Sequence, residues 1–163
     1  MNLHVISPGP RTTVQDAGRT GYAARGFRTC GAADGYAMRT ANLLAGNPQA
    51  AGAAVLEMTL QGGKYQFDGD AVFALAGADM PAALDGRPVP AYTPLLARAG
   101  QVLAIGAARS GLRGYLAVFG GVDTPPVLGS RPTDLKCRMG GLDGRALKAG
   151  DVLPIGAAPA MVE

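Results

Sequence analysis

Turn-forming residues interrupt the apolar stretches of this sequence at short intervals. The 163 residues include twenty-five glycines and twelve prolines, and both residue types favour tight turns over long regular elements. Many short strands joined by turns are typical of β-sandwiches and β-barrels. The sequence therefore predicts a mainly β domain. Runs with strand character lie at residues 3–6, 54–60, 64–67, 71–76, 82–84, 102–105 and 115–119.

One segment departs from the β pattern. In "DGYAMRTANLLAGNP", residues 34–48, apolar side chains recur at the spacing of one helical face. Asp34 can cap the start of a helix, and Gly46 provides a stop. We therefore expect one substantial helix at residues 34–45.

Two smaller signals predict a hairpin and a sheet edge. The segment "LDGRPV", residues 84–89, contains the Asp-Gly pair that is typical of tight β-hairpins. The pattern "RAGQVLAIG" from Arg98 recurs as "KAGDVLPIG" from Lys148, so each copy is expected to form a turn followed by a strand. Because Pro154 lacks a backbone donor, the second strand is expected at a sheet edge or barrel seam.

Positive charge is concentrated near the start of the chain. Residues 11–39 hold five arginines and two aspartates, whereas the rest of the chain has ten basic and ten acidic residues. Arginine suits carboxylate and phosphate ligands better than lysine does, because its planar guanidinium binds them at two points. Solvated surface arginines would give the same composition. No lysine-rich stripe or recognition-helix pattern occurs, so we expect no nucleic-acid partner.

The sequence predicts a cytoplasmic protein without a membrane segment. Its start, "MNLHVISPGP", lacks the basic flank and the apolar length of a signal peptide, and no later stretch approaches the length of a bilayer span. Cys30 and Cys137 lie far apart in sequence, which gives neither a disulfide framework nor a metal-binding spacing. With His4 as the only histidine, no metal site is expected.

Glu57 and the segment "TTVQDAGRTGY" carry the most conspicuous polar residues. The segment contains Gln15, Asp16 and Arg19, whereas Glu57 interrupts the apolar run "AAVLEMTL". A carboxylate within an apolar strand is costly unless it is paired, and Arg113 is a candidate partner. Glu57 is thus either half of a buried ion pair that fixes strand register or a catalytic carboxylate.

A second polar group lies in "GSRPTDLKCRMGGLDGR", which contains Ser130, Asp143 and Arg145. The closely spaced backbone N–H groups of "GGLDGR" could hold an anion. Asn42, on the predicted helix, is expected to bind neighbouring backbone. The sequence has neither a Walker loop nor the G-x-S-x-G motif of serine hydrolases.

Six motifs, in the same order, resemble the allophanate hydrolase subunit 2 family. That family includes the C subunit of bacterial ATP-dependent 5-oxoprolinase and the carboxyltransferase region of urea carboxylase. The segment "VDTPPVLGS" followed by "TDLK" is most similar to the 5-oxoprolinase member. The motifs are "TTVQDAGRTGY", "GAADGYAMRTANLLAGN", "LEMTLQGG", "ALAGAD", "RGYLAVFGGVDTPPVLGS" and "GGLDGRALKAGDVL".

Two features depart from the family pattern. Pro132 stands before Thr133 where family members usually have a serine. The chain also corresponds to about the first half of a typical member. We therefore expect residues 1–156 to form one domain, with residues 157–163 leading toward a second β-rich domain that another polypeptide or a longer chain would supply.

The resemblance implies a cyclophilin-like β-barrel that works with 5-oxoprolinase subunits A and B. The implied reaction is the ATP-dependent opening of the lactam of 5-oxo-L-proline to L-glutamate, a small-molecule amide substrate. Such chemistry needs a carboxylate that handles a proton and cations that stabilise a phosphoryl group. The resemblance implies catalytic roles for Gln15, Asp16, Arg19 and Glu57, and substrate or phosphate binding by Arg113, Ser130, Asp143 and Arg145.

Other functions remain open. A carboxyltransferase component would move a carboxyl group from carboxybiotin to a urea-like amide, and biotin would arrive on another chain because no Met-Lys-Met context occurs here. A non-catalytic module would instead regulate a partner such as a sensor kinase. Asp16 and Arg19 could also pair structurally to hold a loop. We expect the chain alone to be inactive and to self-associate or require a partner.

Overall fold

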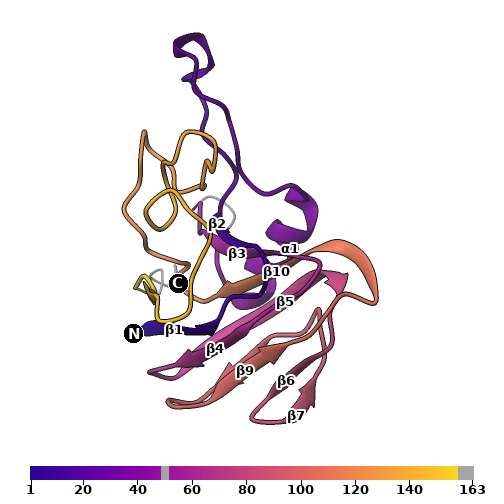
Figure 1. Cartoon of the computed structure of the whole chain (residues 1–163). Coiled ribbons are helices and arrows are strands. Elements are labelled where there is room, and N and C mark those ends of the chain that lie inside the picture. The colour runs from indigo at the N-terminus through magenta and orange to yellow at the C-terminus, as the bar shows by residue number, and fades with distance from the viewer. Residues whose placement is uncertain (49–51, 158–163) are drawn as a thin grey trace.

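Two antiparallel sheets and one α-helix organise the chain (Figure 1) in this computed structural model, which describes residues 1–48 and 52–157. In the six-stranded sheet, the strands lie in the order β11-β1-β4-β9-β6-β7, and in the five-stranded sheet in the order β2-β3-β10-β5-β8. The bounds of the first set are β1 (Asn2–Ser7), β4 (Lys64–Phe67), β6 (Ala82–Leu84), β7 (Arg87–Val89), β9 (Val102–Ile105) and β11 (Val152–Pro154). Those of the second are β2 (Thr12–Gln15), β3 (Val55–Thr59), β5 (Ala71–Asp79), β8 (Leu95–Ala97) and β10 (Ser110–Val118).

The mainly β prediction is therefore confirmed. The pairings define two separate sheets, so closure into a cyclophilin-like barrel stays a prediction. None of the helices in the described part of the chain has the length and apolarity that crossing a bilayer requires. Of the predicted tail at 157–163, residues 158–163 lie outside the described part.

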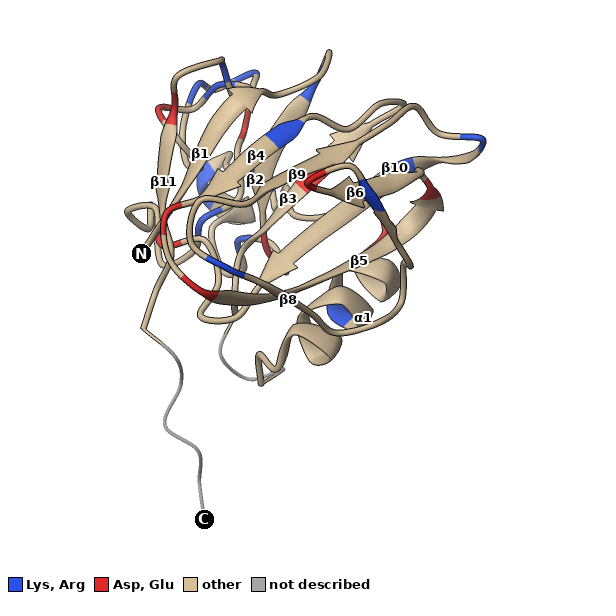
Figure 2. Ribbon diagram, turned by 90° about the horizontal axis from the view of Figure 1, so that it is seen from below, with Lys and Arg blue, Asp and Glu red and all other residues tan. Residues whose placement is uncertain are grey.

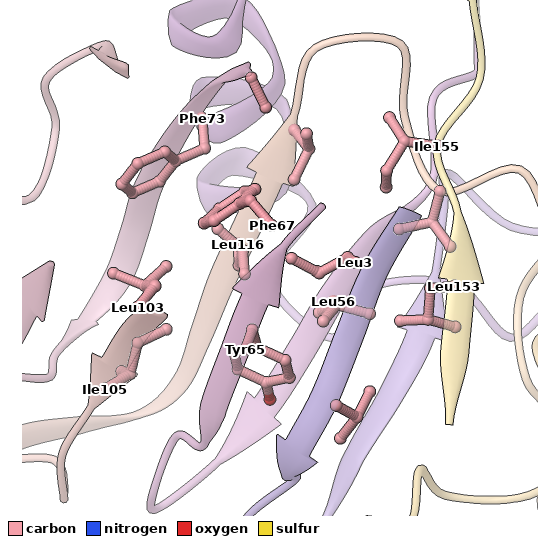
Figure 3. Packing of buried hydrophobic residues seen from close by; sticks show 14 of the residues in the cluster. Leu3, Leu56, Tyr65, Phe67, Phe73, Leu103, Ile105, Leu116, Leu153 and Ile155 are labelled. Carbon is pink, nitrogen blue, oxygen red and sulfur yellow. The ribbon is translucent and has the colours of Figure 1, made fainter. Parts of the chain in front are cut away.

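The main core lies between the two sheets (Figure 3). Alternate residues of each strand point into it, as the two-residue period of a strand requires; in β1 these are Leu3 and Val5. The rings of Phe67 and Phe73 meet within it, with centroids 5.4 Å apart. Removing this apolar surface from water is the main stabilising contribution that the two sheets make to the fold.

The helix α1 (Gly35–Ala45) covers the outer face of the five-stranded sheet against β5 and β10. Alanines at positions 37, 41 and 45 are buried there, and their small side chains allow a close approach to Ala74 and Ala117. The Asp34 carboxylate accepts a hydrogen bond from the Ala37 N–H at 2.9 Å, and Gly46 ends the helix in the left-handed conformation. The predicted helix is confirmed, with Asp34 as its cap.

Several predicted strands have the expected bounds, namely β4, β6 and β9. The predicted Asp-Gly hairpin joins β6 to β7, and Asp85 and Gly86 both have positive φ, 47° and 78°, as a type I′ turn requires. Pro154 lies in β11 at the edge of its sheet, as predicted. Strand β2 lies where the sequence predicts no strand, and β10 is longer than expected.

Two long irregular segments lie together at one end of the sheets (Figure 1). One runs from Asp16 to Ala33, and its exposed middle, residues 20–29, projects from the body as an arm that contains the 3₁₀ helix η1 (Ala23–Arg25). The other lies between β10 and β11. Basic residues are spread over the molecule (Figure 2), including Arg39 in α1 and Lys64 in β4.

Candidate functional site

Asp16 fastens the two irregular segments to each other. Its carboxylate is buried, and Oδ1 accepts a hydrogen bond from the Gly18 N–H at 2.8 Å. Oδ2 accepts from the Arg131 N–H at 2.7 Å, in the second segment. These two N–H groups lie outside the strands and have no strand partner. The Asp16 carboxylate therefore supplies the hydrogen-bond acceptor that each of them needs.

Arg19 is 2% exposed and binds backbone carbonyl groups of the second segment. Its Nε donates to Val127 O at 3.1 Å and its Nη2 to Pro132 O at 3.4 Å. Among the residues that the structure describes, no ion pair joins Asp16 to Arg19. Both side chains hold the same loop, but each binds its backbone rather than the other side chain.

Gln15 completes this group, which we call the loop clasp (Gln15, Asp16 and Arg19 with residues 127–133). Gln15 Nε2 donates to Thr13 Oγ1 at 3.1 Å and to Thr133 O at 3.2 Å. Three buried polar atoms of the loop clasp make no hydrogen bond within the described residues: Gln15 Oε1, Arg19 Nη1 and Ser130 Oγ. Burying a guanidinium without a paired carboxylate costs free energy. The loop clasp therefore contains more buried polar atoms than the hydrogen bonds that hold its loop use. The catalytic roles of its members stay predictions.

The Asp134 carboxylate forms a second link between the irregular segments. It is almost fully buried and binds the guanidinium of Arg28, at the base of the arm. The N–H groups of Lys136 and Cys137 each donate to its Oδ1 at 3.0 Å. The hydrogen bond from Arg28 holds the pKa of the Asp134 carboxyl well below its usual range. The sequence predicts no role for Asp134, because its partner lies in a distant segment.

Arg145 and Asp143 form a separate group near β11. Arg145 binds Asp151 at two points, Nη1 to Oδ2 at 2.8 Å and Nη2 to Oδ1 at 2.9 Å. Its Nη2 lies 3.6 Å from the exposed carboxylate of Asp143. The hydrogen bonds from Arg145 lower the pKa of Asp151. Arg145 is thus engaged within the chain, and its predicted role in binding substrate or phosphate stays a prediction.

Glu57 lies on the face of the five-stranded sheet that α1 covers. It is 7% exposed, and its Oε2 accepts from the Ala33 N–H at 2.7 Å and from the Tyr115 hydroxyl at 2.8 Å. The Tyr115 oxygen also accepts from the Asp34 N–H at 2.8 Å, so it links the carboxylate to the start of α1. Burial, and then contact with Glu57, raises the pKa of Tyr115. The tyrosine is therefore a firm hydrogen-bond donor to Glu57.

Arg113 is the partner of Glu57 that the sequence suggests. Its Nη1 lies 3.8 Å from Glu57 Oε1 and also contacts Thr59 Oγ1. Glu57 Oε2 has two donors, whereas among the described residues Oε1 has the Arg113 guanidinium as its one polar neighbour. Glu57 Oε1 and part of the Arg113 guanidinium can therefore still contact another group.

An open cleft of about 640 Å³ lies beside this pair. We call it the α1 cleft, because residues at the start of α1 form one wall and the ends of β5 and β10 form the other. Arg113 lines it directly, and Glu57 lies behind the wall through its hydrogen bond with Ala33. A smaller cleft of about 420 Å³ lies between Val127 and the glycine-rich turn that contains Asp143.

The predicted site residues thus form three groups: the loop clasp, the Glu57–Arg113 pair, and Arg145 with Asp143. Within the described part of the chain, no side-chain hydrogen bond or ion pair joins one group to another. For residues 1–48 and 52–157, no cluster of three or more His, Cys, Asp or Glu side chains is arranged to hold a metal ion.

Known proteins match this chain over nearly its whole length. It is 50% identical to the C subunit of 5-oxoprolinase from Escherichia coli (strain K12) over 154 residues, which is 94% of this chain and 49% of that protein. It is 43% identical to the urea amidolyase of Lachancea kluyveri, over 93% of this chain and 8% of that protein. The chain thus spans about half of the first relative and a small part of the second.

The fold is also similar to that of a solved structure. The crystal structure of the K. lactis urea amidolyase superposes with a TM-score of 0.92 at 37% identity, covering 98% of this chain and 10% of that one. Residues 25–163 match the family model described as "Carboxyltransferase domain, subdomain A and B". These matches confirm the resemblance that the sequence motifs indicate. The chain therefore belongs to the carboxyltransferase domain family, subdomain A and B.

Proposed function

We propose that this chain is a component of the C subunit of an ATP-dependent 5-oxoprolinase. In this role it helps to open the lactam of 5-oxo-L-proline to L-glutamate, together with subunits A and B. The observation that carries the proposal is the 50% identity to the C subunit of E. coli 5-oxoprolinase over 94% of the chain. We further propose that the two sheets close into a cyclophilin-like barrel and that the protein acts in the cytoplasm.

The Glu57–Arg113 pair supports work on an amide. An amide presents a carbonyl oxygen that a guanidinium can bind and an N–H group that a carboxylate can accept. Because Ala33 and Tyr115 donate to Oε2, Glu57 Oε1 is the oxygen that can accept a proton. The fixed position of the carboxylate favours general acid–base work, since its hydrogen bonds need not rearrange before reaction.

ATP does not fit the α1 cleft of this chain by itself. A triphosphate needs several cationic or N–H donors, whereas the cleft offers Arg113 beside the carboxylates of Asp34 and Asp79. The loop clasp is richer in donors, but Arg19 is buried in it. We therefore assign ATP binding mainly to the partner subunits.

A second candidate function is carboxyl transfer from carboxybiotin to a urea-like amide. The match to urea amidolyase and the TM-score of 0.92 favour it, and the same pair of side chains would bind a urea-like group. Biotin would have to be carried by another chain or domain. A regulatory module without turnover is the third outcome that an experiment has to distinguish.

A chimeric protein tests the proposal. The half of the E. coli 5-oxoprolinase C subunit that matches this chain is replaced by the chain itself, and the product is mixed with subunits A and B. We expect ADP release that depends on 5-oxo-L-proline and not on biotin. The native C subunit is the positive control, and a Glu57→Gln chimera that is still folded at the assay temperature is expected to lose at least about a hundred-fold in turnover.

Two results would overturn the proposal. One is urea carboxylation that requires biotin and occurs without any response to 5-oxo-L-proline. The other is stable binding of a folded chimera to subunits A and B with no ADP release, which would leave a regulatory module.

A further inference from the structure

The α1 cleft is built by backbone features that a plain pair of strands would lack. The pairing of β5 with β10 shifts register between Ser110 and Gly114. At the matching place in β5, Gly77 has a φ of +93°, and a Cβ atom there would collide with the carbonyl oxygen of Arg113. Only glycine therefore allows the two strands to approach at this point. Such irregularities re-aim side chains and often lie beside functional sites.

Tyr92 is held at the mouth of the cleft in an uncommon conformation. Its φ is +55°, which is rare for a bulky residue. Its N–H donates to Leu75 O at 2.7 Å, and its hydroxyl accepts from Gly77 N at 3.0 Å and donates to Gly77 O at 3.1 Å. Three hydrogen bonds, one from the backbone and two at the hydroxyl, thus hold Tyr92 in place although the residue is 53% exposed. Strain that the surroundings maintain is typical of ligand-binding positions.

Both apolar and charged side chains line the α1 cleft. Tyr36, on the first turn of α1, is 75% exposed, and Leu112 is also exposed on the rim. Arg113 and Asp79 also line the cleft, and the Asp79 carboxylate makes no side-chain hydrogen bond within the described residues. A hydrogen-bond donor and an acceptor therefore line the same cleft as two exposed aromatic rings.

We propose that the α1 cleft binds a planar amide or ureido group, with Tyr92 and Tyr36 as its aromatic walls. The ligand carbonyl oxygen accepts from Arg113, and its N–H donates to Asp79. Aromatic rings favour planar groups by stacking, and the two charged side chains match the two polar edges of an amide. This inference rests on the proposed function and assigns its substrate-binding residues. A lactam, urea or the ureido ring of biotin all carry this chemistry.

Binding to the full 163-residue chain tests the site directly. Amide NMR shifts are recorded while 5-oxo-L-proline, 2-pyrrolidinone, urea or biotin is added in separate titrations. We expect shifts at Gly77, Ala78 and Gly111, with Gly86 in the distant hairpin unchanged. A response to both lactams identifies a lactam as the ligand. A response to urea only identifies a urea-like amide, and a response to biotin only identifies the ureido ring of biotin.

Variants distinguish a built site from weak surface binding. Asp79→Asn and Arg113→Gln are each expected to weaken binding about ten-fold, the effect of one charge-assisted hydrogen bond. Tyr36→Ala, at an exposed position, is expected to weaken binding without altering the fold. Leu96→Ala, an exposed residue of β8, is the control that should leave binding unchanged.

The outcomes separate this inference from the proposed function. Shifts that map outside the cleft, or wild-type affinity in Tyr36→Ala, Asp79→Asn and Arg113→Gln variants that are folded at the temperature of the titration, would overturn the site. If the chimera described above still turns over 5-oxo-L-proline when it carries these variants, the proposed function stands and the site fails. If the cleft binds an amide but the chimera releases no ADP, the site stands and the proposed function fails.

Discussion

Arg28 and Asp134 lie 106 residues apart in the sequence and form a charge-assisted contact at two points. The Asp134 side chain is 1% exposed, whereas that of Arg28 is 54% exposed. A surface guanidinium thus neutralises a buried carboxylate and ties the base of the arm to the segment between β10 and β11. Such pairs are costly to break from one side, because the buried charge stays behind.

This contact should make stability depend on pH. The pKa of the Asp134 carboxyl is lowered from 3.8, so its contribution is fully present above the unfolded value and is lost as the pH falls below about 4. We expect Asp134→Asn to lower the free energy of unfolding by about 1–3 kcal/mol at pH 7. The difference from wild type should shrink at pH 3. Denaturant titrations at pH 7, 5 and 3 measure it.

Asp70→Asn is the matched control, since Asp70 binds Arg98 on the exposed surface. Because water screens this exposed pair, the substitution should leave the free energy of unfolding nearly unchanged at all three pH values. A difference between wild type and Asp134→Asn that stays constant from pH 7 to pH 3 would contradict the prediction.

The Glu57–Arg113 pair should show coupling in a double-mutant cycle. Glu57→Gln keeps the shape of the side chain but removes the charge that faces Arg113. We expect each of Glu57→Gln and Arg113→Met to cost about 1–3 kcal/mol, and the double variant to cost less than their sum by at least about 0.5 kcal/mol. Urea unfolding of the four proteins measures the coupling. Strict additivity would mean that the 3.8 Å approach contributes nothing.

Arg19→Lys separates anchoring from catalysis in the loop clasp. Lysine keeps the charge but lacks the planar group that reaches both Val127 and Pro132. We expect the melting temperature to fall by several degrees, consistent with a loss of about 1–2 kcal/mol. Turnover of the chimera that carries Arg19→Lys is measured on the same preparation. Unchanged turnover with lower stability would leave Arg19 as a loop anchor, whereas a loss of turnover of roughly ten- to a thousand-fold with an unchanged melting temperature would make it catalytic.

Asn47 should be important for stability. From the sequence it is only one of the residues that end the helix α1. It is buried, and its Nδ2 donates to Asn42 Oδ1 and to Val118 O, both at 2.9 Å. Its Oδ1 accepts from Gly120 N at 2.8 Å. Asn47→Ala would leave Asn42 Oδ1 and the Gly120 N–H without this partner, while Val118 O keeps its hydrogen bond from the Gly121 N–H, so we expect a loss of about 2–4 kcal/mol. Thermal unfolding measures it, with Leu43→Ala at an exposed position of α1 as the control; equal melting temperatures of wild type and Asn47→Ala would refute the assignment.

The sequence predicts the elements whose signals are local. The α1 cap at Asp34 and the hairpin at Asp85 and Gly86 depend on neighbouring residues alone, so each prediction is confirmed. Strand β2 is missed because its residues are polar and resemble a site loop. The structure buries them between β3 and the segment around Thr133, whose N–H and Oγ1 both donate to Val14 O.

Contacts between distant segments cannot be predicted in the same way. The pairing of Glu57 with Arg113 is predictable because a carboxylate in an apolar strand requires a cation. No comparable signal marks Arg28 as the partner of Asp134, since both lie in polar surroundings. The hydroxyl of Tyr115, which orients Glu57, is likewise hidden within an apolar strand.

Strand β1 pairs with β11, so that Leu3 lies opposite Leu153 and the Ile155 N–H donates to Met1 O. During synthesis, β1 must therefore wait for nearly the whole domain before this partner exists. Contacts of such long sequence separation slow folding, because loop-closure entropy is lost before they form. Until then one edge of β1 has no partner strand, and an unpaired edge is where strands of other chains can add.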